Sequence, residues 1–281
     1  MTNRAFARSM QSVGYLLGHP YKSLVAVWQA REAEKERQYT LATLFPQIEM
    51  NAILENRPIY LKVCSFLWGG SGVLDYALLK AACEFCARKH GEDYQVDYLE
   101  IGTWRGESII NVMESDKVNS AYSVTLSADI DDNATTRSLI KDNANFFLSR
   151  YHSEKFHQVF ANSMSFDFST LNKKFDVIFI DGDHSYEAIL SDTKKMEALL
   201  KDEHSIIVWH DYIQSFSDEI CPATLNAIRA GLSKEKQNHV FHVKNTACAI
   251  YVQGDFRGVE PAAKSSVPTS SFEAEIKQNM L

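Results

Sequence analysis

Two short polar segments, each placed directly after an apolar run, carry the residues best suited to chemistry. The sequence DGDH at 181–184 follows FDVIFI, and HD at 210–211 follows SIIVW. If the two runs are neighbouring parallel strands, Asp181, His210 and Asp211 meet at one end of a sheet. Two carboxylates and an imidazole can hold Mg²⁺ or another divalent cation. In the alternative interpretation, Asp181 caps the next helix and Asp211 binds amides of its own loop.

A proton acceptor is expected in the same part of the chain. His184 lies three residues after Asp181, on the loop that enters the next predicted helix, where it can face a pocket. An imidazole titrates near neutrality, which suits a general base. Asp183 is the alternative base. In that case His184 orients a loop or donates to Asp211.

The first predicted strand ends in a loop with two glycines. Gly102 can make the tight turn, and Gly106 can open the next helix. A dinucleotide fingerprint requires glycine where this chain has Trp104 and Glu107, so NAD or FAD is not expected. A cofactor with a nucleoside and an amino-acid end fits better. Glu100 can face its ammonium group, and the start of the helix can offer amides to its carboxylate.

Between residues 96 and 252, short apolar runs alternate with segments of helical spacing. The runs predicted as strands are Asp97–Gly102, Ala121–Thr125, Phe156–Phe160, Phe175–Ile180 and Ser205–Trp209. The segments predicted as helices are Gly106–Met113, Thr136–Leu148 and Tyr186–Leu200. This alternation predicts a doubly wound, mostly parallel α/β sheet, because continuous apolar strands are buried on both faces. His239–Val243 and Ala247–Val252 predict an antiparallel hairpin at its end.

Three regions of the chain differ in pattern. Residues 1–92 predict an N-terminal helical extension whose clearest helix covers 72–90. Residues 93–253 form the α/β domain. Residues 254–281 contain PAAKSSVPTSS and predict a flexible tail. The glycine-rich turn at 68–72 is expected to help cover the substrate pocket.

The composition narrows the class of protein. The chain has 281 residues, 45% of them hydrophobic, and a formal net charge of −7, which disfavours nucleic acid as the main partner. No stretch reaches the roughly 20 apolar residues that span a bilayer, so no membrane partner is expected and the cytoplasm is the expected location. Five cysteines do not imply a disulfide framework. Cys83 and Cys86 are expected to be buried in a helix, not to form a redox or zinc site.

At this point two motifs resemble a known family. Glu100-x-Gly102-x-x-x-Gly106 resembles motif I of class I methyltransferases, and the segment at 175–212 resembles macrocin-type sugar O-methyltransferases and their bacterial small-molecule relatives. The resemblance covers about residues 65–252. It implies a Rossmann-like sheet of seven strands in the order 3-2-1-4-5-7-6, with the last strand antiparallel. It also implies S-adenosylmethionine as cofactor and a metal ion held by acids at two strand ends.

The resemblance places the cofactor on the loops that follow the strands. The residues expected to contact it are Glu100, Gly102, Thr103, Gly106, Ser108, Thr125, Asn162, Ser163 and Asp181. Thr125 stands where the family usually has an acid that holds the ribose hydroxyls, and Asp129 can substitute from the next loop. Asn162 matches the position that contacts adenine. A polar turn is the alternative interpretation of Asn162.

The expected activity is metal-assisted O-methylation of a hydroxyl on a small molecule, such as a sugar or a natural product. Two alternatives remain open. One is a metal-dependent hydroxylase or hydrolase that keeps the fold, and the other is a non-catalytic cofactor-binding scaffold, which the missing acid at Thr125 favours. The acceptor's identity and any homo-oligomer are left open, because acceptor pockets in this class are built from variable segments.

Overall fold

The computed structural model describes residues 44–59, 72–129, 137, 140–141, 148–214, 219–254 and 256. In this part of the chain, a sheet of eight strands has the order β1-β7-β8-β6-β5-β2-β3-β4. The strands are β1 Gln47–Ile48, β2 Val96–Ile101, β3 Val118–Thr125, β4 Phe156–Phe160, β5 Val177–Ile180, β6 Ile206–Trp209, β7 Val240–Val243 and β8 Ala249–Tyr251. Neighbours are parallel, except that β8 is antiparallel to both β6 and β7.

The Rossmann-like strand order expected from the sequence is confirmed, with one addition. Read from β4 to β7, the sheet has the predicted order with its antiparallel strand β8 in the predicted place. The prediction of seven strands is wrong, because β1 pairs with the outer side of β7. The amide of His242 donates to Pro46 O at 2.9 Å, and that of Lys244 donates to Ile48 O at 3.0 Å. A strand of two residues is too short to show the alternation of polar and apolar residues that marks a strand in a sequence. Residues 47–48 were therefore included in the predicted helical extension.

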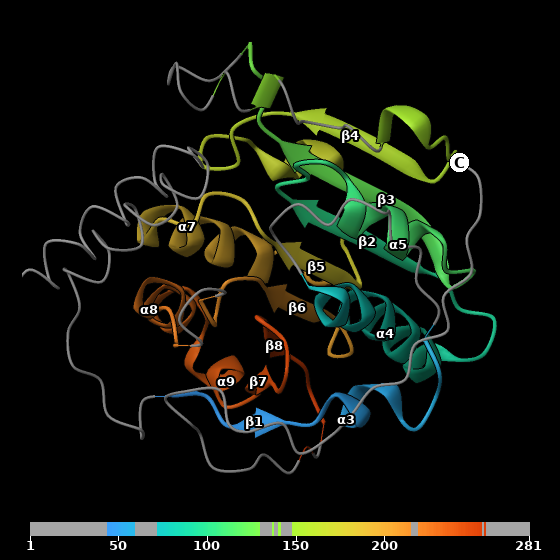
Figure 1. Ribbon diagram of the computed structural model, residues 1–281, viewed down its shortest axis with the longest axis vertical. Coiled ribbons are helices and arrows are strands. Elements are labelled where there is room, and N and C mark those ends of the chain that lie inside the picture. The colour runs from blue at the N-terminus through green and yellow to red at the C-terminus, as the bar shows by residue number, and fades with distance from the viewer. Residues whose placement is uncertain are drawn as a thin grey trace, which may run out of the picture. The chain divides into compact units, whose positions relative to one another are not determined.

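Helices cover both faces of the sheet. They are α3 Met50–Leu54, α4 Val73–His90, α5 Glu107–Met113, α7 Tyr186–Glu197, α8 Pro222–Gly231 and α9 Lys234–Gln237, with 3₁₀ turns at Leu148–Arg150 and Phe168–Leu171. Figure 1 shows α4 and α5 on one side of the sheet and α7 and α8 on the other, as a doubly wound fold requires. Within the described ranges, no helix combines the length and apolar character that a membrane crossing needs.

Parts of four sequence predictions fall outside the described residues. They are the N-terminal extension at 1–43 and 60–71, the turn at 68–72 apart from Gly72, most of the helix expected at 136–148, and the tail at 254–281 apart from two residues. The cysteine pair, by contrast, is described. Cys83 and Cys86 are free and buried in the middle of α4, as expected of core residues.

The central strands are buried throughout and lie in register. Every residue of β2, β5 and β6 is buried, and each buried aliphatic side chain contributes about 1.5–3 kcal/mol to stability. Ile101 is paired with Ile180, and Ile180 is paired with Trp209. The three strands therefore end side by side, and the loops that follow them leave the sheet at the same edge.

Candidate functional site

The sheet ladder continues one residue beyond the strands and sets the position of the polar loops. The amide of Asp181 donates to Ile101 O at 2.9 Å, and the amide of His210 donates to Ile180 O at 3.1 Å. The acid after β5 and the imidazole after β6 therefore begin their loops from adjacent, hydrogen-bonded positions. This pairing brings together residues that are about thirty positions apart in the sequence.

Asp211 turns the chain sharply after β6. Its φ of 53° lies in the left-handed region, which aspartate adopts more readily than most residues. The next residue, Tyr212, is fully buried, and its amide donates to Ala247 O at 2.8 Å. The turn thus anchors Tyr212 in the core and leaves the Asp211 carboxylate beside the residues that follow β5.

The structure brings the three predicted metal ligands together. His210 Nδ1 lies 3.3 Å from Asp181 Oδ1 and 3.2 Å from Asp211 Oδ1. The His210 side chain is 3% exposed, whereas those of Asp181 and Asp211 are 22% and 24% exposed. Among the described residues, neither nitrogen of His210 has a partner with hydrogen-bonding geometry. A cation coordinated by the three side chains would satisfy Nδ1, so this donor set fits a divalent metal ion.

The electrostatics of His210 follow from its two acidic neighbours. Burial by itself lowers the pKa of the imidazole, but the carboxylates of Asp181 and Asp211 outweigh burial and raise that pKa well above its ordinary value. Burial likewise raises the pKa of Asp211, and the imidazoles of His184 and His210 reverse this and hold it well below its ordinary value. Without a metal ion, opposite charges therefore hold together the acidic cluster, which consists of Asp181, His210 and Asp211.

The two predicted bases lie in different surroundings. His184 is 44% exposed, and its Nδ1 forms an ion pair with Asp211 Oδ2. Burial lowers the pKa of His184, but the Asp211 carboxylate raises it to about 9. Asp183 is exposed, and its Oδ1 accepts a hydrogen bond from the amide of Ser185 at 2.7 Å. His184 thus pairs with the acidic cluster, while Asp183 stabilises the loop.

Asp181 does not cap the helix that follows it. Helix α7 has Ser185 as its N-cap, and the Ser185 hydroxyl accepts a hydrogen bond from the amide of Ala188 at 3.3 Å. The alternative interpretation of Asp181 as a helix cap is therefore wrong. Its carboxylate faces His210 instead.

The loop after β2 is shaped by its two glycines. Gly102 has a φ of 85°, and a Cβ on it would collide with the Asp181 carbonyl oxygen and lie 2.7 Å from Gly182 Cα. Gly106 has a φ of 91°, and a Cβ there would collide with Leu148. Any side chain at either position would push apart packed segments, in addition to the backbone strain. The loop after β2 is consequently in direct contact with the segment that carries Asp181.

A buried acid and a half-buried acid beside this loop suit a positively charged ligand. Glu100 is fully buried, and its Oε2 accepts a hydrogen bond from the Tyr98 hydroxyl at 3.0 Å. Glu107 Oε2 accepts one from the Tyr76 hydroxyl at 3.2 Å. Within the described chain, Oε1 of each acid lacks a partner with hydrogen-bonding geometry. An ammonium group beside either oxygen would satisfy it, whereas a phosphate would not.

The protonation of Glu100 follows from its burial. Burial raises its pKa to about 8, although the hydroxyls of Ser108 and Tyr98 favour the ionised form and lower it. The carboxyl is therefore mostly protonated at neutral pH in the free protein. A cationic group beside it would favour the carboxylate and release the proton.

The residues that tie the cofactor loop to the sheet include two of the predicted contacts. Thr103 is buried, its hydroxyl contacts the hydroxyl of Ser123, and its amide lies 3.4 Å from Thr125 Oγ1. Thr125, at the position expected to hold the ribose, thus connects β3 to the loop. Ser108 is buried in the first turn of α5, beside Glu100.

The loop after β4 is held by its own polar side chains. Asn162 Oδ1 accepts a hydrogen bond from the amide of Met164 at 2.9 Å, which is the polar turn considered as the alternative to adenine binding. The Ser163 hydroxyl donates to Asp192 Oδ2 at 3.2 Å. Both residues lie at the expected edge of the sheet, and their contacts in the described chain support the loop.

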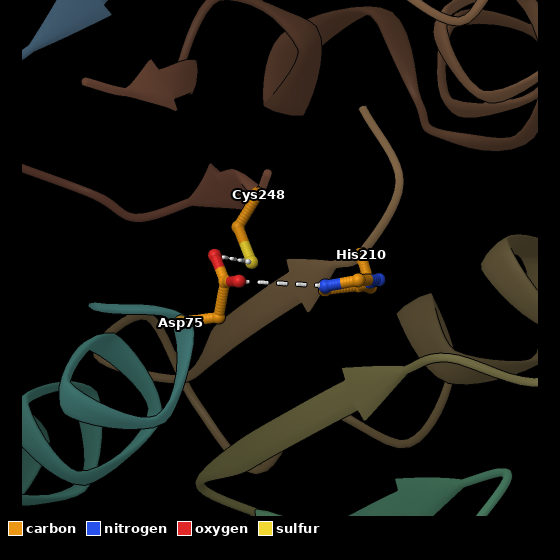
Figure 2. Close-up of side chains that lie close together, drawn as sticks. All are labelled: Asp75, His210 and Cys248. Carbon is orange, nitrogen blue, oxygen red and sulfur yellow. Dashed lines mark hydrogen bonds and ion pairs between the residues drawn. The ribbon is translucent and has the colours of Figure 1, made fainter. Parts of the chain in front are cut away.

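A further acid lies on the Nε2 side of His210 and was not predicted from the sequence. Asp75, in the first turn of α4, lies with its Oδ2 3.6 Å from His210 Nε2, and Cys248 lies beside it (Figure 2). Asp75 follows Gly72 by three residues, where an acid is explained by helix capping alone. The sequence pattern therefore does not identify the partner of this acid, which lies more than a hundred residues later in the chain.

Comparisons with known proteins place part of this chain beside methyltransferases. A family model described as a methyltransferase domain matches residues 99–212, a segment that contains every site residue predicted from the sequence. Curated protein sequences gave no match. Among solved structures, a putative caffeoyl-CoA O-methyltransferase from Staphylococcus aureus is 17% identical with a TM-score of 0.39, over 83% of this chain and 98% of that one.

Two further solved structures are similar over smaller shares. The MycE methyltransferase of the mycinamycin pathway, in complex with Mg, SAH and mycinamycin VI, is 16% identical with a TM-score of 0.37, over 63% of this chain and 48% of that one. Spermidine synthase from Thermotoga maritima is 13% identical with a TM-score of 0.38, over 66% of this chain. The chain spans 60% of the length of that synthase.

The first prediction concerns the contact made by Gly102. We expect Gly102→Ala to weaken binding of S-adenosylhomocysteine at least tenfold in calorimetric titration, because the new Cβ separates the loop from Asp181. Gly91→Ala is the matched control, since Gly91 also has a positive φ, 127°, but a Cβ there meets no atom within 4 Å. Equal affinities of the two variants would contradict the proposed role of the Gly102 contact.

The second prediction concerns the proton on Glu100. Because the pKa of Glu100 is raised to about 8, binding of a cationic amine should release close to one proton at pH 7, and less as the pH rises above 8. Titration in buffers of different ionisation enthalpy measures this release. Glu100→Gln should abolish it. Proton release that persists in Glu100→Gln would place the titrating group elsewhere.

Proposed function

From the match of residues 99–212 to a methyltransferase-domain model, we propose that the protein is a class I, metal-assisted O-methyltransferase. It transfers a methyl group from S-adenosylmethionine to a hydroxyl of a small molecule. The observation that carries the proposal is the close contact between Gly102 and the backbone of Asp181. This contact joins the loop suited to the cofactor with the acidic cluster suited to the acceptor.

The cofactor end of the site favours a sulfonium amino acid over a nucleotide phosphate. Glu100 and Glu107 offer unpaired carboxylate oxygens to an ammonium group. The start of α5, directly after Gly106, offers backbone amides to a carboxylate. A ligand with both groups on one carbon, as in the methionine part of S-adenosylmethionine, matches these two features together.

The acceptor end contains a base and its orienting partner. Asp211 engages His184 through Nδ1, so Nε2 is the nitrogen turned away from that acid. An acid that holds an imidazole in this way fixes its orientation and stabilises the cation formed when it takes a proton. We assign proton removal from the acceptor hydroxyl to the neutral form of His184, with Asp183 as the second choice. Because the pKa of His184 is raised to about 9, the neutral form increases as the pH rises toward that value.

The reaction then balances as a single displacement. The acceptor oxygen loses its proton to His184 Nε2 and forms a bond to the methyl carbon, while the carbon–sulfur bond breaks and its electron pair neutralises the sulfonium. The products are the methyl ether and S-adenosylhomocysteine. A divalent cation on Asp181, His210 and Asp211 would supply positive charge that lowers the pKa of the hydroxyl. The residues of this chain align the reactants and exclude water.

The third prediction tests methyl transfer and its need for a cation. With labelled S-adenosylmethionine and a panel of hydroxylated sugars and natural products, we expect label in the product, and exhaustive chelation should reduce the rate at least about 100-fold. Asp181→Asn should do the same, and Asp167→Asn, at an exposed turn, should keep the full rate. Full turnover after chelation would exclude the metal. Hydroxylated or hydrolysed product without label would favour the alternative enzyme.

The fourth prediction separates the two bases. His184→Gln should lower kcat about 100-fold or more, because proton transfer by a positioned base contributes on that scale. Its affinity for S-adenosylhomocysteine should stay within threefold of the unmodified protein. Asp183→Asn, whose carboxylate stabilises the loop, should lose less than tenfold. The reverse ranking of the two variants would assign the base to Asp183.

A further inference from the structure

The side of His210 that faces away from Asp181 is occupied by a buried carboxylate. Asp75 is 4% exposed and His210 is 5% exposed, so their approach excludes most water. Asp75 Oδ2 lies 3.6 Å from His210 Nε2. A dashed line marks this ion pair in Figure 2. The imidazole therefore has an acid at each nitrogen, with Asp75 on Nε2 and both Asp181 and Asp211 on Nδ1.

Asp75 is held in place by donors from two parts of the chain. The amide of Gly72, before α4, donates to Oδ2 at 2.5 Å. The amide of Ala247, in the turn between β7 and β8, donates to Oδ1 at 2.8 Å, and the Cys248 thiol donates to the same oxygen at 3.5 Å. Because both oxygens of Asp75 are held by hydrogen bonds, its carboxylate cannot reorient when the His210 imidazole rotates. The orientation of the imidazole therefore depends on the carboxylate.

This arrangement fixes which nitrogen of His210 can bind a metal ion. A histidine that binds a metal through one nitrogen carries its proton on the other, which donates to a carboxylate or carbonyl. On the Nε2 side, Asp75 Oδ2 lies at the ion-pair distance of 3.6 Å and is the carboxylate that would accept this proton once the two groups approach. The opposite nitrogen faces Asp181 and Asp211. Imidazole nitrogen suits first-row transition ions, whereas Mg²⁺ prefers oxygen ligands throughout.

We propose that Asp75 is a positioning residue that presents His210 Nδ1 as a metal ligand. We also propose that the resulting two-carboxylate, one-imidazole set binds Mn²⁺ and related transition ions in preference to Mg²⁺. The proposal rests on the metal-assisted function above and specifies the class of ion for that site. No contact between Asp75 and the cofactor or acceptor is required.

The cluster behind His210 is a weaker choice for the ion itself. Asp75, His210 and Cys248 also bring their ligand atoms within 4.8 Å of one another. The oxygens of Asp75 already accept three donors, however, and the Cys248 sulfur carries one of the donated protons. All three residues are buried, whereas Asp181 and Asp211 are partly exposed and give an ion a way in.

The experiment compares metal binding in the chelator-treated full-length protein. Mn²⁺ binding is followed by electron paramagnetic resonance, with Mg²⁺ as competitor. We expect Mn²⁺ to bind at least tenfold more tightly than Mg²⁺, and Asp75→Asn to weaken Mn²⁺ binding about 10–100-fold. His210→Asp should narrow the preference for Mn²⁺. Cys248→Ala is the matched control. It removes only the longest of the three hydrogen bonds to Asp75 and keeps those from the amides of Gly72 and Ala247, so its affinity for Mn²⁺ should stay within threefold.

A spectroscopic measurement keeps the proposal testable if Asp75→Asn fails to fold. In the unmodified protein loaded with Zn²⁺, the nitrogen resonances of His210 should show a protonated Nε2 and a metal-bound Nδ1. Equal affinity for Mn²⁺ and Mg²⁺, a metal-bound Nε2, unchanged Mn²⁺ affinity in folded Asp75→Asn, or loss of binding in Cys248→Ala would each overturn it.

Binding of S-adenosylhomocysteine and transfer of labelled methyl are measured on the same samples. If S-adenosylhomocysteine still binds and methyl transfer is still detected, but one of the contradicting metal-binding results is found, only the roles proposed for Asp75 and for the ion are wrong. If neither is detected, the proposed function fails, whatever the metal preference.

Discussion

The loop after β2, which suits the cofactor, and the segment that carries Asp181 meet through their backbones. The turn at Gly102 packs against the Asp181 carbonyl so closely that no Cβ fits between them. This packing is possible because β2 and β5 are neighbours in register, and Ile101 O accepts the hydrogen bond of the Asp181 amide. The relative position of the two loops at this edge is therefore set by two adjacent strands and one glycine.

The acidic cluster at the same edge is subject to a second, electrostatic constraint. Burying several carboxylates together is unfavourable unless opposite charge or hydrogen-bond donors compensate. Here His210 lies among Asp75, Asp181 and Asp211, and the amides of Gly72 and Ala247 stabilise the carboxylate of Asp75. The arrangement concentrates negative charge at one strand end. Such a concentration is a typical property of a cation site and an unusual one for a purely structural core.

Stability and function are separated along the strands. Inside the sheet, β2, β5 and β6 consist of buried apolar side chains with few polar exceptions, and Glu100 is the exception nearest to the loops. At the carboxyl edge, the shifted pKa values belong to the groups of the proposed site, which are Glu100, His184, His210 and Asp211. At the opposite edge, Asp176 accepts hydrogen bonds from the amide of Asp97 and from Lys201, which closes that end of the sheet. This division lets the loops carry the chemistry while the strands keep them in place.

The sequence by itself determined the class of sheet and the residues that meet at its edge, whereas the strand order was implied by the resemblance to a known family. Continuous β-branched and aromatic runs mark buried parallel strands, and polar residues directly after them must leave at one edge, so Asp181, His210 and Asp211 could be grouped in advance. Only the tertiary structure decided which groups approach from other elements. Asp75 comes from a helix more than a hundred residues earlier, and β1 adds an edge strand of two residues. Local patterns reflect the neighbours of a residue along the chain, whereas these contacts depend on how a distant helix and turn pack against the sheet.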